Sequence, residues 1–127
     1  MAQKVENTTK VKLVYYYVGL SFLALFASFW LLSNLGNCML WQDEAETACV
    51  AQTVLSEGIP KGTDGINFFS QQEGREYGYH NEWKLHPWFQ FYWLALFFSI
   101  LETSTLSARL PFTLLGLATV FISFFLS

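Results

Sequence analysis

Charge is scarce in this chain of 127 residues, and the charge that is present is unevenly placed. Charged side chains make up 13% of the sequence, about half the share found in a typical soluble domain. No charged residue occurs between positions 13 and 42. This composition argues against a soluble domain and favours segments that lie in a lipid bilayer.

Several common functional motifs are also missing. The sequence has no glycine-rich phosphate loop, no internal repeat and no Cys/His spacing typical of zinc, so no metal site or cofactor is expected from this segment. Basic residues number 7 against 10 acidic ones, which is the wrong sign for a nucleic-acid surface. The sequence does not decide whether the two cysteines, Cys38 and Cys49, form a disulfide, because one pair alone is weak evidence for a bridge.

The sequence does contain three apolar runs, at 13–34, 87–103 and 110–127, and each is predicted to be a transmembrane helix. The thirty uncharged residues of the first region would give about 45 Å of helix, more than the ~30 Å hydrocarbon core requires. The second run is short, about 22 Å, and is expected to gain a turn at one or both ends. Trp88, Tyr92 and Trp93 would then lie in the interfacial belt of aromatics.

Two features of the chain ends have alternative interpretations: whether the N-terminal part is cleaved, and whether the protein continues beyond the last residue. A cleaved signal peptide is disfavoured because the first run is too long for its apolar region. The segment 35–38 looks like a lipoprotein cleavage box, but Asn37 does not fit the small residue required before the cysteine. The apolar end of the chain favours an N-terminal part of a longer protein; the alternative is a small three-helix membrane protein.

Basic residues at the helix ends predict the orientation, because such residues concentrate on the cytoplasmic side. The cytoplasmic parts are expected to be residues 1–12, with Lys4, Lys10 and Lys12, and the turn 104–109, with Arg109. The loop 35–86 then lies outside, and from position 36 on it holds eight acidic residues against three basic ones. The chain is accordingly predicted to be a multi-pass protein of the inner cell membrane.

The external loop is predicted to carry a short amphipathic helix at about 43–57, lying at the membrane surface. Asp43 is a good N-cap, and Glu46 completes a capping box with it. Gly58 followed by Pro60 is a stop pattern. Close packing on another helix is expected from the small residues Ala45, Ala48 and Ala51.

The rest of the loop is rich in turns. Two short strands, 66–69 and 77–79, are predicted to flank a turn at 73–75. Loops of this length without strong structure are usually functional or disordered. The aromatic residues here argue against disorder.

Four motifs resemble bacterial protein-mannosyltransferase-like glycosyltransferases (family 39 in the broad sense), whose layout the aminoarabinose transferases of lipid A share. The motifs are Trp41-Gln42-Asp43-Glu44-Ala45, Glu57-Gly58-Ile59-Pro60, the His86-Pro87 segment, and Ser107-Ala108-Arg109-Leu110-Pro111. Their order and spacing match across about 41–120. Trp88 departs from the pattern, since many relatives have a second proline there.

The resemblance implies the N-terminal piece of a C-type glycosyltransferase fold: an all-α integral membrane protein with three transmembrane helices here. Such enzymes are longer than this chain, and a piece alone would be inactive. They transfer a sugar from a polyprenyl-phosphate donor to an acceptor hydroxyl, on a protein, lipid or glycan, at the outer face of the membrane. Direct attack by the hydroxyl inverts the anomeric centre.

In the family, an acidic residue of the first external loop is the presumed catalytic base, and the match is to Asp43 with Glu44 beside it. A carboxylate can accept the proton that the attacking hydroxyl loses. The leaving phosphate needs positive charge, for which Arg75, Lys84 and His86 are the candidates.

Each of these residues has a simpler interpretation. Asp43 suits a helix cap and Glu44 a solvated helix face, while a lysine near a helix end usually extends to the interface. His86 suits a helix cap, Arg75 suits a solvent-exposed turn, and Arg109 suits a cytoplasmic anchor. The alternative function is a small non-enzymatic membrane protein whose acidic external loop binds a partner.

Overall fold

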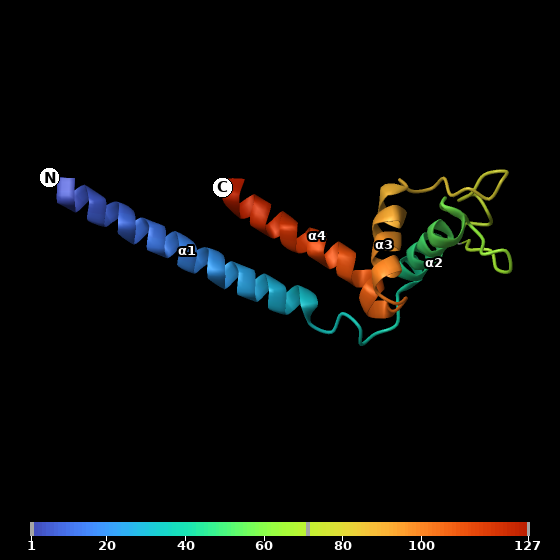
Figure 1. The fold of residues 1–127 in the computed structure, drawn as a ribbon, viewed down its shortest axis with the longest axis horizontal. Helices are drawn as coiled ribbons and strands as arrows, with labels where there is room; N and C mark the ends of the chain where they lie inside the picture. Colours follow the sequence, from blue (N-terminus) through green and yellow to red (C-terminus); the bar gives the residue numbers. More distant parts are fainter. Residues whose placement is uncertain (1, 71, 127) are drawn as a thin grey trace. The chain divides into compact units, whose positions relative to one another are not determined.

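The computed structural model describes residues 2–70 and 72–126; the side chains of residues 2–9, that of Lys4 included, lie outside this description. Four helices follow one another along the chain: α1 (Ala2–Leu32), α2 (Gln42–Glu57), α3 (Phe89–Ile100) and α4 (Thr105–Leu126) (Figure 1). They belong to two compact units. One contains the chain up to Ser33 and from Phe112 onward, and the other is Asn34–Pro111.

Two helices are long and apolar enough to cross a membrane, over Lys10–Leu32 in α1 and Thr105–Leu126 in α4. They cover the predicted apolar runs 13–34 and 110–127. Large apolar side chains on α1 are exposed, among them Leu25 at 73% and Trp30 at 70%. Because water solvates such side chains poorly and lipid solvates them well, these two helices indicate association with a membrane.

The third predicted span, 87–103, is not shown. Its helix, α3, has 12 residues and is about 18 Å long, well short of the ~30 Å hydrocarbon core. It does not gain the expected extra turns, because Leu101 has extended backbone (φ −109°, ψ 138°) and ends it. Within the described residues, two helices meet the length and composition of a span, and a third span is not shown.

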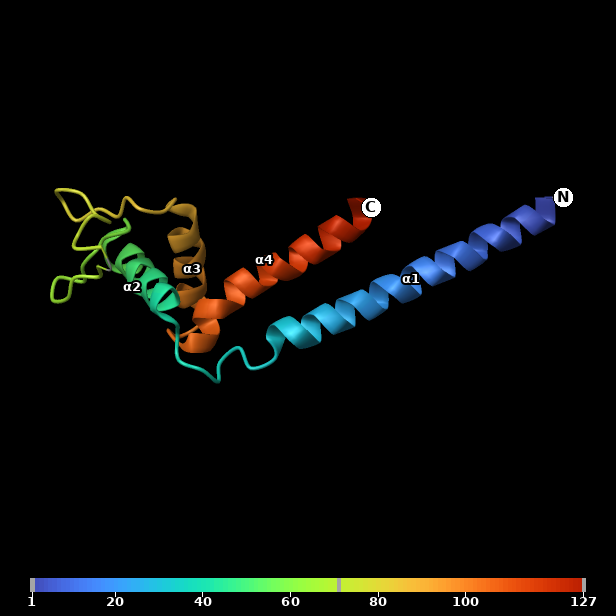
Figure 2. The ribbon, with the colours of Figure 1, turned by 180° about the vertical axis from the view of Figure 1, so that it is seen from behind.

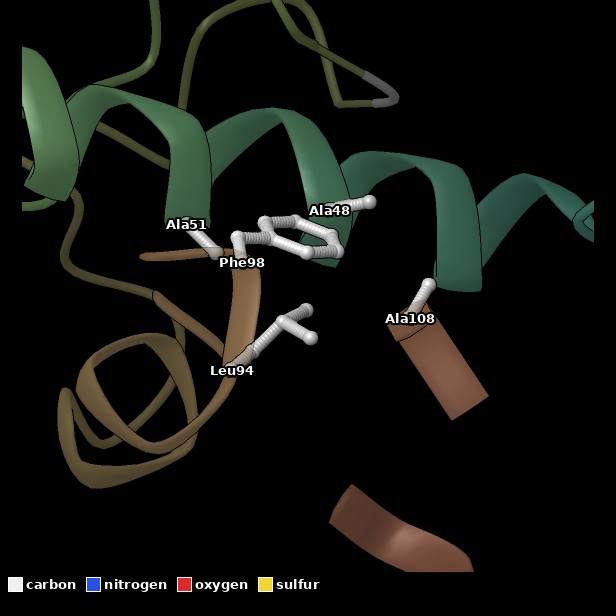
Figure 3. Packing of buried hydrophobic residues seen from close by; sticks show 5 residues of the cluster. All are labelled: Ala48, Ala51, Leu94, Phe98 and Ala108. Atoms are coloured by element: carbon white, nitrogen blue, oxygen red, sulfur yellow. The ribbon is translucent and has the colours of Figure 1, made fainter. Parts of the chain in front are cut away.

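Helix α3 packs on α2 instead (Figure 2). Ala48 and Ala51 of α2 lie against Leu94 and Phe98 of α3, with Ala108 beside them (Figure 3). The small side chains let the two helices approach closely, as the sequence predicted for this face of 43–57. Burial of a Leu and a Phe contributes roughly 1.5–3 kcal/mol each.

The aromatic residues predicted for an interfacial belt donate hydrogen bonds to backbone carbonyls of the same unit. Trp88 Nε1 donates to Trp83 O at 2.7 Å, Tyr92 Oη to Gly58 O at 2.9 Å and Trp93 Nε1 to Pro111 O at 3.2 Å. These bonds tie the N-terminal half of α3 to the loop, to the end of α2 and to α4. The three residues thus have a structural role, and their place in an interfacial belt stays a prediction.

A second small core forms where the long loop folds back on the helices. Val50 of α2, Trp83 of the loop and Phe91 of α3 are buried together. Gly58 closes α2 in the left-handed conformation at φ 78°, and its N–H bonds to Val54 O. The predicted helix end at Gly58 is confirmed.

The loop itself differs from the prediction. Among the described residues there is no β-strand, only isolated bridges such as Thr63 with Phe68 and Tyr77 with Trp83. The segments 66–69 and 77–79 do not pair with each other, because each forms its bridge with a nearer neighbour. The turn at 73–75 is present, with Glu73 and Gly74 at positive φ.

Helix α4 begins before the predicted boundary at 110. Ser104 and Ser107 cap its start reciprocally: Ser107 N–H donates to Ser104 Oγ at 3.1 Å, and Ser104 N–H donates to Ser107 Oγ at 2.8 Å. Arg109 is consequently helical, and Pro111 lies inside the helix rather than in its first turn. The polar residues of the predicted turn 104–109 supply this cap, which hydropathy alone does not reveal.

Candidate functional site

The start of α2 is capped differently from the prediction. The N-cap is Trp41, and its N–H donates to the Oε2 atom of Glu44 at 2.8 Å. Asp43 is therefore inside the first turn, and Glu46 has no part in this cap. The predicted role of Asp43 as the N-cap of this helix is therefore wrong, because Trp41 is the N-cap and Glu44 accepts its N–H.

Glu44 is bound by the guanidinium of Arg109. Arg109 Nε donates to Glu44 Oε1 at 3.0 Å, and Nη2 donates to Oε2 at 2.7 Å. Such two-pronged pairing is the strongest arrangement available to an arginine and a carboxylate. The pair joins the first turns of α2 and α4, which are 65 residues apart in sequence.

The same guanidinium also organises the chain that precedes α2. Its Nη1 donates to the carbonyls of Leu35 and Cys38 at 3.0 and 3.1 Å, and its Nη2 donates to Met39 O at 3.0 Å. Every N–H bond direction of the planar group is thereby used. Arg109 is the residue on which the segment 35–44 is anchored.

Hydrogen bonding from Arg109 lowers the pKa of Glu44 below its ordinary value, although burial opposes the shift; the Trp41 N–H and the charge of Arg109 act in the same direction. A carboxylate held in this way is a weak proton acceptor. Glu44, predicted as a second catalytic acid, is held by Arg109 in this structure.

The Glu44–Arg109 contact also corrects the predicted orientation. The sequence placed Glu44 outside and Arg109 on the cytoplasmic side, yet their side chains are 2.7 Å apart within one compact unit. Both residues must be on the same side of any membrane. The physical reason is the short α3, which does not carry the chain across before Arg109.

Asp43 lines a cavity of about 290 Å³. Helix α2 supplies Asp43, Glu46 and Thr47 to the wall, and α3 supplies Gln90. Asp43 and Glu46 share a face because residues three apart on a helix are neighbours. The volume lies near the lower end of the ~300–1,000 Å³ typical of ligand sites.

The loop closes the other side of this cavity with Gln72, Glu76, Leu85 and His86. Glu76 is fully buried, and its carboxylate accepts hydrogen bonds from Ser70 Oγ at 2.9 Å and from the Gln72 N–H. Burial of a charged group is costly unless hydrogen bonds compensate, which these donors do. The wall therefore combines three carboxyl groups with amide, hydroxyl and imidazole groups.

His86 is oriented by Trp83. The Trp83 Nε1–H donates to His86 Nδ1 at 3.4 Å, and the two rings are stacked at 15°. Because tryptophan can only donate, Nδ1 is the acceptor nitrogen, and the proton of the neutral ring is on Nε2. His86 then offers its Nε2–H to the site as a hydrogen-bond donor.

The three residues predicted to bind the donor phosphate are not brought together as one cationic group. His86 lines the cavity, Lys84 is paired with Glu82 at 3.5 Å, and Arg75 is exposed in the turn 73–75. Lys84 and Arg75 are thus on loop surfaces outside the cavity wall.

No group of three or more His, Cys, Asp or Glu side chains among the described residues is arranged to hold a metal ion. Cys38 and Cys49 are both free, the first exposed and the second half-buried. Burial, followed by the nearby charge of Asp64, raises the pKa of the Cys49 thiol.

Sequence reasoning placed Asp43 and His86 among the site residues and missed Glu76, Gln72 and Gln90. Nothing in the local sequence singles these three out, because they come from a turn and from the start of an apolar run. Arg109 was noted only as an anchor, although it lies in one of the four motifs.

No family model, no curated protein and no solved structure matches this chain.

Proposed function

We propose that this chain belongs to a membrane glycosyltransferase that moves a sugar from a polyprenyl-phosphate donor to an acceptor hydroxyl. The observation that carries the proposal is that the two adjacent acids, Asp43 and Glu44, have different surroundings. Glu44 is held by Arg109, whereas Asp43 lines the cavity beside it. A free carboxylate in a polar pocket next to a fixed structural acid is the arrangement that a general base needs.

In this proposal Asp43 accepts the proton of the acceptor hydroxyl as the oxygen forms a bond to the anomeric carbon. The bond from that carbon to the phosphate oxygen breaks, and the polyprenyl phosphate leaves with its electron pair. Attack and departure occur on opposite faces of the sugar, so the anomeric centre is inverted. No acid is required for the leaving group, because phosphate is already a stable anion.

Orientation in the membrane follows from the lysines at the start of α1. With Lys10 and Lys12 on the cytoplasmic side, the span Lys10–Leu32 delivers the unit Asn34–Pro111 to the outer face, and α4 returns. The unit then faces the same leaflet as a lipid-linked sugar exposed to the outside. The non-enzymatic alternative, an acidic loop that binds a partner, gives no reason for a cavity at Asp43.

Replacement of Asp43 tests the proposal. In membranes that contain the complete gene product and a polyprenyl-phosphate sugar, Asp43→Asn should lower the transfer rate by about 10²-fold or more, the usual contribution of a general base. Asp64→Asn is the matched control, because Asp64 is exposed in the loop and an asparagine oxygen can still accept from the Asn67 N–H. Equal transfer by wild type and Asp43→Asn, at equal amounts in the membrane, would refute the role of Asp43.

A further inference from the structure

The cavity beside Asp43 has a lining that is selective by charge. Asp43, Glu46 and Glu76 line it with carboxyl groups, and His86 is the only other residue with a titratable side chain among the described residues of its wall. Arg75 and Lys84, the basic residues next in sequence to the loop residues of the wall, lie on loop surfaces outside the cavity. The one arginine near α2, Arg109, is fully engaged by Glu44 and the backbone.

The hydrogen-bonding capacity of the wall points to a particular ligand chemistry. Carboxylate oxygens only accept hydrogen bonds, and they bind hydroxyl and ammonium donors strongly. The amides of Gln72 and Gln90 and the hydroxyl of Thr47 both donate and accept, as the hydroxyls of a sugar do. A phosphate offers only acceptor oxygens and a negative charge, so it would meet three carboxyl groups at short range and lose its hydration.

We propose that this cavity binds the acceptor, and that it accepts an uncharged or positively charged polyhydroxyl group while excluding an anionic one. The proposal rests on the glycosyltransferase function above and adds the class of acceptor. The donor phosphate then lies outside the cavity, and only the sugar's anomeric carbon reaches the mouth at Asp43. An acceptor whose nucleophile is itself a phosphate oxygen is excluded.

The size of the cavity agrees with a single small group. About 290 Å³ is too little for a drug-sized ligand and suits one sugar ring or a comparable polyol. Leu85 is the only apolar side chain in the wall, so a hydrocarbon chain is a poor occupant.

The test measures binding by this chain in lipid nanodiscs, with no donor present. The probes are an uncharged methyl hexoside, its 2-amino analogue and its 6-phosphate, followed by saturation-transfer NMR and competition. We expect the first two probes to compete for one site. The phosphate should bind about tenfold more weakly or worse, because the repulsion between its charge and a nearby carboxylate is about 1–4 kcal/mol. A loss of about 1.4 kcal/mol raises the Kd tenfold. Binding of the phosphate equal to or tighter than that of the uncharged probe would overturn the proposal.

Two variants assign the binding to the cavity. Glu46→Gln removes one carboxylate from the wall. It should reduce the gap in affinity, the ratio of the Kd of the phosphate probe to that of the uncharged probe, about threefold. Glu57→Gln, on the same helix but at its far end and paired with Lys61, is the matched control and should leave the gap unchanged. Gln90→Trp should abolish binding of the uncharged probe by filling the cavity; retained binding in this variant, with a native circular dichroism spectrum, would also overturn the proposal.

The outcome is independent of catalysis. If the uncharged probe binds as expected but Asp43→Asn transfers normally, then the proposed function fails and the binding site stands. If Asp43→Asn is inactive but the phosphate probe binds best, then the function stands and the acceptor class is wrong.

Discussion

Replacement of Arg109 by methionine should destabilise the unit Asn34–Pro111. Arg109 makes three hydrogen bonds to the carbonyls of Leu35, Cys38 and Met39 and a two-pronged bond to Glu44. A carbonyl hydrogen bond contributes about 1 kcal/mol net. The Glu44 side chain is 41% exposed, so solvent screening limits the ion pair to about 1 kcal/mol.

These contributions put the loss for Arg109→Met at about 3–4 kcal/mol, a large part of the 5–15 kcal/mol of a typical domain. Arg109→Lys keeps the charge but has no planar fork, and should lose about 2 kcal/mol. Glu44→Gln leaves the three carbonyl bonds intact and should lose about 1 kcal/mol. The order of the three losses is the prediction that the geometry makes.

Urea unfolding of the protein in nanodiscs measures these losses through tryptophan fluorescence, since Trp83 is fully buried in the unit and becomes exposed on unfolding. Lys84→Met is the control, because its ion pair with Glu82 is at 3.5 Å and the lysine side chain is 59% exposed. It should change stability by no more than about 0.5 kcal/mol. If Arg109→Met is as stable as Lys84→Met, or if Glu44→Gln costs more than Arg109→Met, the anchoring role of Arg109 is refuted.

Three further predictions follow from the same unit. The folded-state pKa of Glu44 is lowered from 4.5, so the stability it contributes is present above about pH 4.5 and is lost as the pH falls through the folded pKa; the difference in unfolding free energy between wild type and Glu44→Gln should therefore shrink from about pH 7 to about pH 3, and a constant difference would contradict this. Phe98→Ala should cost about 3–5 kcal/mol in the same urea assay because Phe98 is buried between α2 and α3, whereas Phe89→Ala on the same helix, 69% exposed, should cost about 0.5 kcal/mol or less; similar losses would argue against this packing. Iodoacetamide should label the exposed Cys38 well before Cys49, whose pKa is raised by burial, and urea should abolish the difference; equal rates in the folded protein would show that Cys49 is not where the structure has it.

The helix α2 was predictable because its features are local. Small residues at 48 and 51 mark a packing face, and Gly58 marks an end, since both features depend on residues within a few positions of each other. The cap at its start was not predictable in this way. By residue type Asp43 is the better N-cap, and only the backbone geometry decides that Trp41 is the N-cap and that Glu44, three residues on, accepts its N–H.

The third predicted span is not shown, for a related reason. The run from 87 to 103 is as apolar as a transmembrane helix, but four of the 12 residues of its helix are buried inside the protein, where α3 packs on α2. Hydropathy measures how poorly a segment is solvated by water and does not distinguish the two kinds of cover. Length was the better indicator, because 12 helical residues are too few to cross.

By itself, the sequence determined that this protein has long apolar helices, an acidic and aromatic-rich segment between them, and a helix bounded by Gly58. These properties depend on composition and on neighbours along the chain. Only the tertiary structure decided which acid is held and which lines a cavity, because Arg109 reaches Glu44 from 65 residues away and Glu76 reaches the wall through the folded loop. Contacts between residues far apart in the sequence arise only when the chain packs. Asp43 and Glu44 are both acids and are adjacent in the sequence, so the residues that packing places next to each of them determine how they differ.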